Sequence, residues 1–273
     1  MSAIEVLVDG LDHPEGVAYD PRADVVWAGG EAGQLYRVDM RARTYELHAR
    51  APGFVLGVTV DGRGRVAICC EGAGSLCVLD DGAVRTLHDG LTRPNYAAFA
   101  ADGTLYLSDS GTWTRNDGRV FRLSPDDELE LYSTGLPHFP NGCAVTPDGR
   151  WLWTVESYVP TVNRFDLATG ALREVTRLDG TVPDGVALTE NEGVLVSCYR
   201  PDRIVHIDRD GAVETVAEDP QGTILSAPTN IVFVGADRAR LVSANLGRRH
   251  LTLLDVGLRG AALHYPERWA ADA

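Results

Sequence analysis

The chain has 273 residues, of which 44% are hydrophobic and 23% are charged. This composition is typical of a globular protein that buries a large core, and it excludes a disordered chain. The 39 acidic and 25 basic residues give a formal charge of −14. Such a charge repels a phosphate backbone, so we expect no nucleic-acid partner.

No segment approaches the roughly 18 consecutive apolar residues of a membrane-spanning helix, and the N-terminal segment lacks the pattern of a signal peptide. We therefore expect a cytoplasmic protein without a membrane partner, acting on a small molecule as a monomer or weak homodimer. The five cysteines form no CxxC pair, so we interpret them as reduced, mostly packed thiols.

A unit of related sequence recurs along the chain. It begins with "HPEGVAYD" at 13–20 and returns as "FVLGVTV", "RPNYAAF", "FPNGCAV", "VPDGVAL" and "APTNIVF". One position of the unit holds, in order, Glu15, Leu56, Asn95, Asn141, Asp184 and Thr229, at spacings of 41, 39, 46, 43 and 45 residues. Repeats of this length are typical of solenoids and propellers.

The first unit shows the expected strands most clearly. An apolar strand at 16–20 is followed by a turn and a second apolar strand at 25–30, then by an alternating strand at 34–39 and a polar strand at 44–50. The sequence therefore predicts an all-β fold, a six-bladed β-propeller with four antiparallel strands per blade, as a single domain over residues 1–273.

The ends of the chain differ from the repeat. The last unit ends with "HLTLLDVG" and supplies no clear fourth strand, whereas "IEVLVDGL" at 4–11 has the character of one. We expect this N-terminal strand to close the sixth blade, which leaves no free sheet edge at the seam. We expect the tail "YPERWAADA", 265–273, to be partly disordered.

The tripeptide Pro-Asp-Gly occurs twice, at 147–149 and at 183–185, and the two copies have different positions in the unit. Asp148 falls in the turn between the first and second strands, where Asp and Gly form tight turns. Asp184 falls at the entry to the first strand, the innermost strand of a blade. We therefore interpret Asp148 as a turn residue and Asp184 as a residue of the central channel.

The six equivalent positions are expected to converge around the channel. Two carboxylates and two carboxamides are costly to hold together there, because like charges in a partly desolvated site raise each other's pKa. A bound cation would remove this conflict. The ring contains only oxygen ligands, without His or Cys, which favours a hard divalent cation. The alternative is that these polar groups hydrogen-bond ordered water in a wet channel.

The ordered set "HPEGVAYD", "RPN", "FPNGCAVTPDGRWLWTVES", "VPDGVALTENEGVLVSCY" and "APTNIVF" resembles the gluconolactonase family, which includes regucalcin, and more distantly diisopropylfluorophosphatase. The resemblance covers almost the whole chain. It implies a six-bladed propeller with a divalent cation bound by Glu15, Asn141 and Asp184. Calcium is the metal expected first, with zinc, manganese, magnesium or iron as alternatives.

The resemblance also implies that Arg93 and Asn95 bind substrate, with Asn95 as an alternative metal ligand. The family's commoner "RPND" is "RPNY" here, so Tyr96 changes the pocket. Family members typically hydrolyse sugar lactones, and a channel cation would act as Lewis acid. Asp184 is the expected catalytic residue, as general base or, in the competing role, as nucleophile.

Several neighbouring residues have two interpretations. Arg93 either contacts substrate or pairs with an acid at the surface, and Trp113, in the long loop 110–119, either covers the pocket or packs on its own loop. His13 and His138 border the ring positions, but we interpret them as structural. Asp109 and Glu156, at equivalent second-strand ends, are expected to bind loop amides, with support of the metal as the alternative. We expect no catalytic role for these last four residues.

Three functions are compatible with these features. The first is a metal-dependent lactonase or related carboxylic ester hydrolase. The second is a phosphotriesterase-like hydrolase, and the third is a calcium-binding propeller without turnover. The converging carboxylates argue against the third, because a docking surface needs no such ring in its channel.

Overall fold

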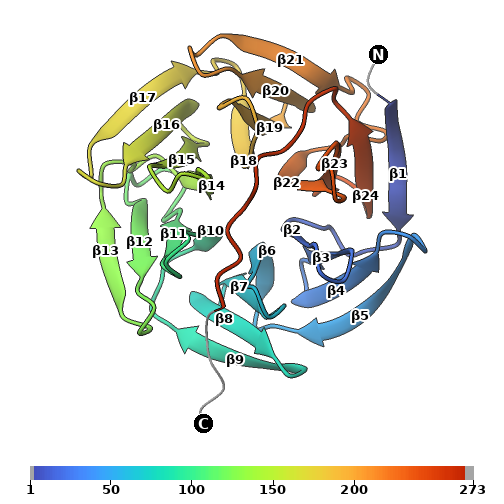
Figure 1. Ribbon diagram of the computed structural model, residues 1–273, viewed down its shortest axis with the longest axis horizontal. Helices are drawn as coiled ribbons and strands as arrows, with labels where there is room; N and C mark the ends of the chain where they lie inside the picture. Colours follow the sequence, from blue (N-terminus) through green and yellow to red (C-terminus); the bar gives the residue numbers. More distant parts are fainter. Residues whose placement is uncertain (1–2, 268–273) are drawn as a thin grey trace.

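The strands of this computed structural model, which describes residues 3–267, form six four-stranded antiparallel sheets around a central channel (Figure 1). The prediction of a six-bladed propeller is therefore confirmed. The described residues contain no α-helix, and none of them forms a helix long and apolar enough to cross a membrane.

Each of the first five blades is a meander of consecutive strands, from the innermost to the outermost. The first blade has β2 (Val17–Asp20), β3 (Val25–Gly29), β4 (Gln34–Asp39) and β5 (Thr44–Arg50). The second has β6 (Phe54–Val60), β7 (Val66–Glu71), β8 (Ser75–Asp80) and β9 (Ala83–His88). The third has β10 (Pro94–Phe99), β11 (Leu105–Asp109), β12 (Arg119–Leu123) and β13 (Leu129–Ser133).

The fourth and fifth blades follow the same plan, and the sixth joins the two ends of the chain. The fourth has β14 (Pro140–Val145), β15 (Trp151–Glu156), β16 (Thr161–Asp166) and β17 (Leu172–Arg177). The fifth has β18 (Val182–Leu188), β19 (Val194–Arg200), β20 (Arg203–Ile207) and β21 (Val213–Glu218). The sixth has β22 (Pro228–Val234), β23 (Arg240–Asn245), β24 (His250–Asp255) and, as its outermost strand, β1 (Ala3–Asp9).

The seam of the propeller lies in the sixth blade. β1 pairs antiparallel with β24, with Glu5 opposite Leu253, so the predicted closure by the N-terminal strand is confirmed (Figure 1). This pairing satisfies the free edge of β24, which would otherwise expose unpaired backbone groups.

The hydrophobic core is divided among the interfaces between blades. Each of six buried clusters draws its side chains from two neighbouring blades, as Leu35 of the first blade and Ile68 of the second do in one of them. The inner strands are buried on both faces, whereas an outermost strand such as β5 is almost entirely exposed. This explains why the first strand of each unit is a continuous apolar run and the fourth strand is polar.

All five cysteines are free and buried, as expected. Asp148 lies in the exposed turn between β14 and β15, where its Oδ1 accepts hydrogen bonds from the Thr146 hydroxyl at 2.6 Å and the Arg150 amide at 3.0 Å. These bonds hold its pKa below the usual range. Asp148 is thus a turn residue, whereas Asp184 is a buried residue of innermost strand β18.

A C-terminal segment, residues 260–267, crosses the channel at the end opposite to the strand entries, and we call it the strap (Figure 1). Ala261 donates its amide to the Leu188 carbonyl at 2.9 Å, and the Tyr265 hydroxyl donates to the Tyr19 carbonyl at 3.1 Å. The strap thereby joins the fifth blade to the first across the axis. Of the tail that was expected to be partly disordered, residues 265–267 belong to the strap, and residues 268–273 lie outside the described part of the chain.

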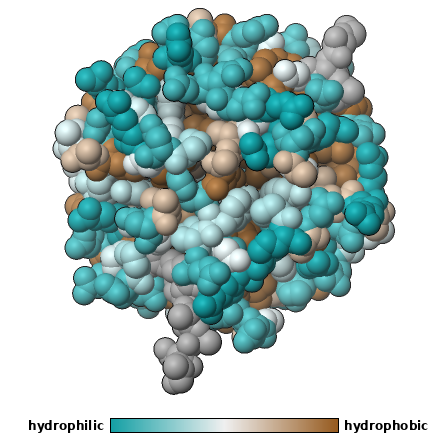
Figure 2. All heavy atoms as spheres, in the orientation of Figure 1, coloured by the Kyte–Doolittle hydropathy of each residue, from teal (hydrophilic) through white to brown (hydrophobic). Residues whose placement is uncertain are grey.

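The strap covers an apolar chamber of about 210 Å³ in the part of the channel opposite to the strand entries. Its walls include Ala18, Val60, Ala98 and Ala187, and strap residues 261–265 line its far end. On the strap face, apolar atoms are visible in a central hollow, whereas hydrophilic residues cover most of the surrounding surface (Figure 2). The two ends of the channel therefore differ in chemistry, because the polar ring lies only at the end where the innermost strands begin.

Glycine follows the ring position in four of the six blades, at Gly16, Gly57, Gly142 and Gly185. A Cβ on any of them would overlap the carbonyl oxygen of the ring residue in the next blade. The backbones of neighbouring blades approach so closely here that only a residue without a side chain fits. These glycines therefore set the radius of the channel at the ring.

We predict that Gly142→Ala lowers the free energy of unfolding by about 2 kcal/mol, because the added methyl group forces the fourth and fifth blades apart. The measurement is the midpoint of urea denaturation. Gly135→Ala is the control, since its Cβ would meet only side-chain atoms, Leu172 Cδ2 at 3.0 Å and Ser133 Oγ at 3.2 Å. Equal losses in the two variants would show that the close backbone approach is not the reason for glycine.

Candidate functional site

Four polar side chains of the predicted ring are buried at the entries of the innermost strands. Glu15 is 4% exposed, Asn95 3%, Asn141 2% and Asp184 6%. In each of them one oxygen has no hydrogen-bond partner among the described residues, namely Glu15 Oε2, Asn95 Oδ1, Asn141 Oδ1 and Asp184 Oδ1. Buried polar atoms almost always have a partner, so four unpartnered oxygens in one ring indicate a binding site.

At the other two ring positions, no side chain offers a free oxygen as a ligand. Leu56 of the second blade is apolar. The Thr229 hydroxyl of the sixth blade donates to the Glu15 carbonyl at 2.9 Å. The available oxygens therefore come from the first, third, fourth and fifth blades.

Two serines fix the orientation of the ring amides. Ser110 donates its only hydroxyl proton to the Pro140 carbonyl at 2.7 Å, so it must accept the hydrogen bond from Asn95 Nδ2 at 2.9 Å. Ser157 does the same between the Pro183 carbonyl, at 2.6 Å, and Asn141 Nδ2, at 3.1 Å. The nitrogen of each amide is thereby bound to the protein, which leaves its carbonyl oxygen as the free atom.

The two ring carboxylates affect each other. Burial raises the pKa of Glu15 well above its ordinary value, and the charge of Asp184 raises it further. Burial raises the pKa of Asp184 to about 7, while hydrogen bonding from Asn141 acts in the opposite direction. Without a compensating positive charge, the folded protein therefore disfavours the state in which both groups are ionised.

This donor set fits a hard divalent cation. It offers two carboxylates and two amide oxygens, which are the ligand types that calcium and magnesium prefer. A bound cation would both contact the unpartnered oxygens and stabilise the ionised forms of Glu15 and Asp184, whose pKa values are raised without it. The candidate ligands are the ones that the sequence indicated, Glu15, Asn141 and Asp184, with Asn95 beside them.

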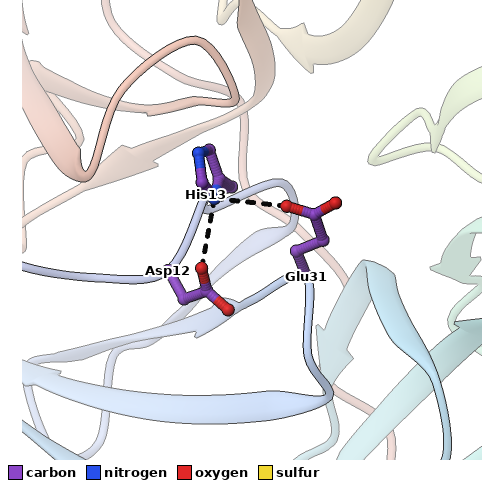
Figure 3. A group of neighbouring side chains, drawn as sticks. All are labelled: Asp12, His13 and Glu31. Carbon is purple, nitrogen blue, oxygen red and sulfur yellow. Dashed lines mark hydrogen bonds and ion pairs between the residues drawn. The ribbon is translucent and has the colours of Figure 1, made fainter.

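A second group of potential ligands lies at the rim, where Asp12, His13 and Glu31 have ligand atoms within 4.8 Å of one another (Figure 3). His13 Nδ1 lies 3.1 Å from Asp12 Oδ1 and 3.2 Å from Glu31 Oε2. Asp12 also accepts a hydrogen bond from Gln34 Nε2 at 2.8 Å. We interpret the group as an ion-pair cluster that holds the loop before Glu15, because its members are partly or fully exposed and engaged with one another.

Carboxylates at the ends of second strands hold the loops that lead into the ring. Asp109 accepts hydrogen bonds from the amides of Thr92 at 3.1 Å and Arg93 at 2.6 Å, and Glu156 accepts one from the amide of His138 at 2.6 Å. The expected binding of loop amides is therefore confirmed for both carboxylates.

The sequence reading missed two residues at equivalent strand ends. In the sixth blade, Asn245 accepts a hydrogen bond from the Ser226 amide at 2.9 Å, as Asp109 and Glu156 do in their blades. In the second blade, Glu71 lies close enough for its charge to raise the pKa of Glu15. Alignment of the second strands would have identified both, because "VAICCE" and "RLVSAN" end at the same point as "LYLSD" and "WLWTVE".

Arg93 lies on the rim of the ring, half-buried. Its Nε is 2.8 Å from Glu71 Oε1, and its guanidinium lies 5.5 Å from the centre of the Phe139 ring. The structure thus shows the pairing of Arg93 with an acid, and contact between Arg93 and a substrate stays a prediction.

Trp113 packs against the fourth blade. It makes edge-to-face contacts with Phe139, at 4.7 Å between ring centres, and with Tyr158, at 5.4 Å, both from the fourth blade. His138, beside them, contacts Asn116 through Nδ1 at 3.0 Å. These contacts agree with a structural role for His138.

Tyr96 and Asn230 occupy the position after the ring in the two blades that lack the glycine. Tyr96 is 8% exposed, lines the apolar chamber, and has a pKa raised by burial, so its phenol stays protonated. Asn230 is fully buried, and neither atom of its amide has a partner among the described residues. Just beyond the ring, Tyr96 therefore gives the chamber wall a neutral polar group.

The sequence model for the SMP-30/gluconolactonase/LRE-like region matches residues 13–244. The chain belongs to this family. The matched residues include all six ring positions and Glu71, whereas Asn245 lies one residue beyond them. No curated protein matches the sequence, and the more distant resemblance to diisopropylfluorophosphatase is not confirmed by these comparisons.

Solved structures share the propeller at low sequence identity. A gluconolactonase from Xanthomonas campestris is 22% identical with a TM-score of 0.80, over 94% of this chain and 89% of that one. The calcium-binding protein regucalcin from Agrobacterium tumefaciens is 17% identical with a TM-score of 0.81, over 98% of both chains. A luciferin-regenerating enzyme is 17% identical with a TM-score of 0.80, over 97% of this chain and 100% of that one. At these identities the similarity establishes the shared fold.

We predict that the protein freed of metal by a chelator becomes more stable as the pH falls from 8 to 6. The folded-state pKa of Asp184, about 7, lies above the ordinary value of 3.8, so the folded state takes up the proton first and stability rises as pH falls through this window. The gain expected from this group is about 1.4 kcal/mol.

Melting temperatures at the two pH values measure the effect, and the difference between the protein and Asp184→Asn isolates it from the titration of histidines. Asp148→Asn, which changes an exposed turn carboxylate, should keep the full pH dependence. Because burial also raises the pKa of Glu15, the electrostatic account of the ring is wrong if the double variant Glu15→Gln/Asp184→Asn keeps it too.

Proposed function

We propose that this protein hydrolyses lactones, or related small cyclic esters, with one divalent cation held by Glu15, Asn141 and Asp184. The observation that carries the proposal is the ring of buried oxygens without partners, and family membership supports its interpretation as a hydrolase site. The gluconolactonase among the structural relatives supports the same class of substrate.

Calcium is the proposed metal, since every candidate ligand atom is an oxygen and a relative of the same fold is named a calcium-binding protein. When bound, the cation would polarise the lactone carbonyl and stabilise the negative charge that develops on its oxygen. Zinc, manganese, magnesium and iron are the alternatives to be compared with it.

Asp184 is the proposed general base, which removes the proton from the water that attacks the carbonyl carbon. Burial raises its pKa to about 7 in the protein without metal, and its Oδ1 has no hydrogen-bond partner among the described residues. Attack by the carboxylate itself is the competing role.

Asn95 and Arg93 are the proposed substrate-binding residues. The free carbonyl oxygen of Asn95 accepts a hydrogen bond from a substrate hydroxyl or joins the metal ligands. Arg93 is held at the rim by Glu71, which leaves its remaining N–H groups to donate to the substrate. Both residues stand in the third blade, so one blade would orient the ester relative to the carboxylates.

The test is a pH-indicator assay with a panel of lactones, before and after chelation and re-addition of single metals. We expect chelation to abolish turnover and calcium to restore it. Asp184→Asn should lower kcat by about 100-fold or more, as expected for loss of a general base. Glu15→Gln should weaken metal binding, measured by calorimetry, and Asp148→Asn should change neither.

Other outcomes separate the alternatives. Turnover of phosphotriesters without turnover of lactones would favour the phosphotriesterase-like function. Tight metal binding without hydrolysis of either class would favour a non-catalytic calcium-binding propeller. Full activity in both Asp184→Asn and Glu15→Gln would overturn the assignment of the site.

A further inference from the structure

Three aromatic side chains, Trp113, Phe139 and Tyr158, form one contiguous surface beside the ring, which we call the aromatic wall. Trp113 contacts Phe139 at 4.7 Å and Tyr158 at 5.4 Å between ring centres. Phe139 is 8% exposed and forms the base of the wall, whereas Trp113 is 39% and Tyr158 45% exposed. The wall therefore presents two aromatic rings to solvent on a buried support.

The residues of the aromatic wall are close neighbours in the sequence of residues that form or hold the ring. Phe139 stands two residues before Asn141. Tyr158 follows Ser157, the residue that accepts the hydrogen bond from Asn141 Nδ2 at 3.1 Å. Arg93, two residues before Asn95, lies over Phe139 at 5.5 Å. A substrate bound at the free oxygens of Asn95 and Asn141 would therefore have the wall at its side.

The exposure of Trp113 and Tyr158 is unusual for this molecule. Among the described residues, most other large apolar side chains that are exposed belong to the outermost strands, as Val6, Tyr45 and Leu131 do, and one, Leu263, lies in the strap. Trp113 and Tyr158 are instead in loops at the ring end of the channel, and they contact each other. Adjacent exposed aromatic residues at a site typically contact a ligand.

The polar groups around the wall already have partners. Glu156 accepts hydrogen bonds from the His138 amide at 2.6 Å and the Thr161 hydroxyl at 2.9 Å. His138 Nδ1 contacts Asn116, and Arg93 Nε contacts Glu71. Apart from the remaining N–H groups of Arg93, this side of the site therefore offers mainly apolar contact area.

We propose that the aromatic wall selects lactones that carry an alkyl or aryl substituent beside the ester, in preference to lactones with a hydroxyl group on each carbon. The inference rests on the proposed function and deepens it, because it names the substrate class of the same site. Burying a few methylene groups against Trp113 and Tyr158 supplies the preference.

Three probes test the inference: γ-decalactone, which carries a hexyl chain, γ-butyrolactone, which carries no substituent, and glucono-δ-lactone. We expect kcat/KM for γ-decalactone to exceed that for each of the other two by at least about tenfold, or about 1.4 kcal/mol. Trp113→Ala should lower kcat/KM for γ-decalactone by about tenfold through KM, with kcat nearly unchanged. It should have little effect on γ-butyrolactone.

Leu47→Ala, which removes an exposed apolar side chain from outermost strand β5, is the matched control and should leave all three substrates unaffected. Trp113→Phe preserves an aromatic ring and should retain most of the preference, which keeps the test valid if Trp113→Ala folds poorly. Preference for glucono-δ-lactone, or a γ-decalactone preference that survives Trp113→Ala, would overturn the inference.

Binding separates this inference from the proposed function. Calorimetry with 2-hexylcyclopentanone and cyclopentanone, cyclic ketones that cannot be hydrolysed, measures the wall without any chemistry. Tighter binding of the hexyl compound that is lost in Trp113→Ala supports the wall even if no lactone is hydrolysed. Equal affinity for the two ketones contradicts it, whatever the activity of the protein.

Discussion

The structure depends on one constraint, the meeting of buried oxygen atoms at the start of the innermost strands. Glu15 and Asp184 would repel each other there, and the free oxygens of Asn95 and Asn141 add no positive charge. Surrounding features keep the oxygens in place despite this cost. Serine hydroxyls hold the amide nitrogens, and glycines bring the blade entries close to the axis. The fold thus concentrates negative potential at one point, in a protein that already has an excess of acidic residues.

The hydroxyl groups around the ring connect the blades as well as the ligands. Ser110 binds the backbone of the fourth blade, Ser157 that of the fifth, and Thr229 that of the first. Each bond joins a residue near the site to the chain segment that carries the next ring residue. The positions of the oxygens are therefore set by backbone groups of rigid strands, which gives the pre-organisation that a binding site needs.

Much of this architecture was readable from the sequence, because rotational repetition converts a spacing of about 40 residues into a shared position around an axis. The repeat that placed Glu15, Asn141 and Asp184 at the same position of the unit also distinguished Asp184 from Asp148, although both stand in identical tripeptides. Sheet closure by β1 followed from the missing fourth strand of the last unit.

The features that escaped prediction depend on contacts between units. The orientation of Asn95 follows from Ser110 and a carbonyl of the next blade, which no pattern within one unit contains. Trp113 finds its partners in the following blade, so its own loop gave no guide to its contacts. The sequence of the strap shows no periodicity and belongs to no repeat. Its residues make hydrogen bonds through backbone groups and through the side chains of His264 and Tyr265, and a short sequence carries no signal for such contacts.

The seam in the sixth blade has a consequence for how the molecule is made. Five blades consist of consecutive strands, so each is complete as soon as its own stretch of about 40 residues has left the ribosome. β1 emerges first, yet the strand that it pairs with, β24, ends at Asp255. In a nascent chain, β1 therefore stays without its partner strand during translation of the five intact blades, and the ring closes only after β24 has been made.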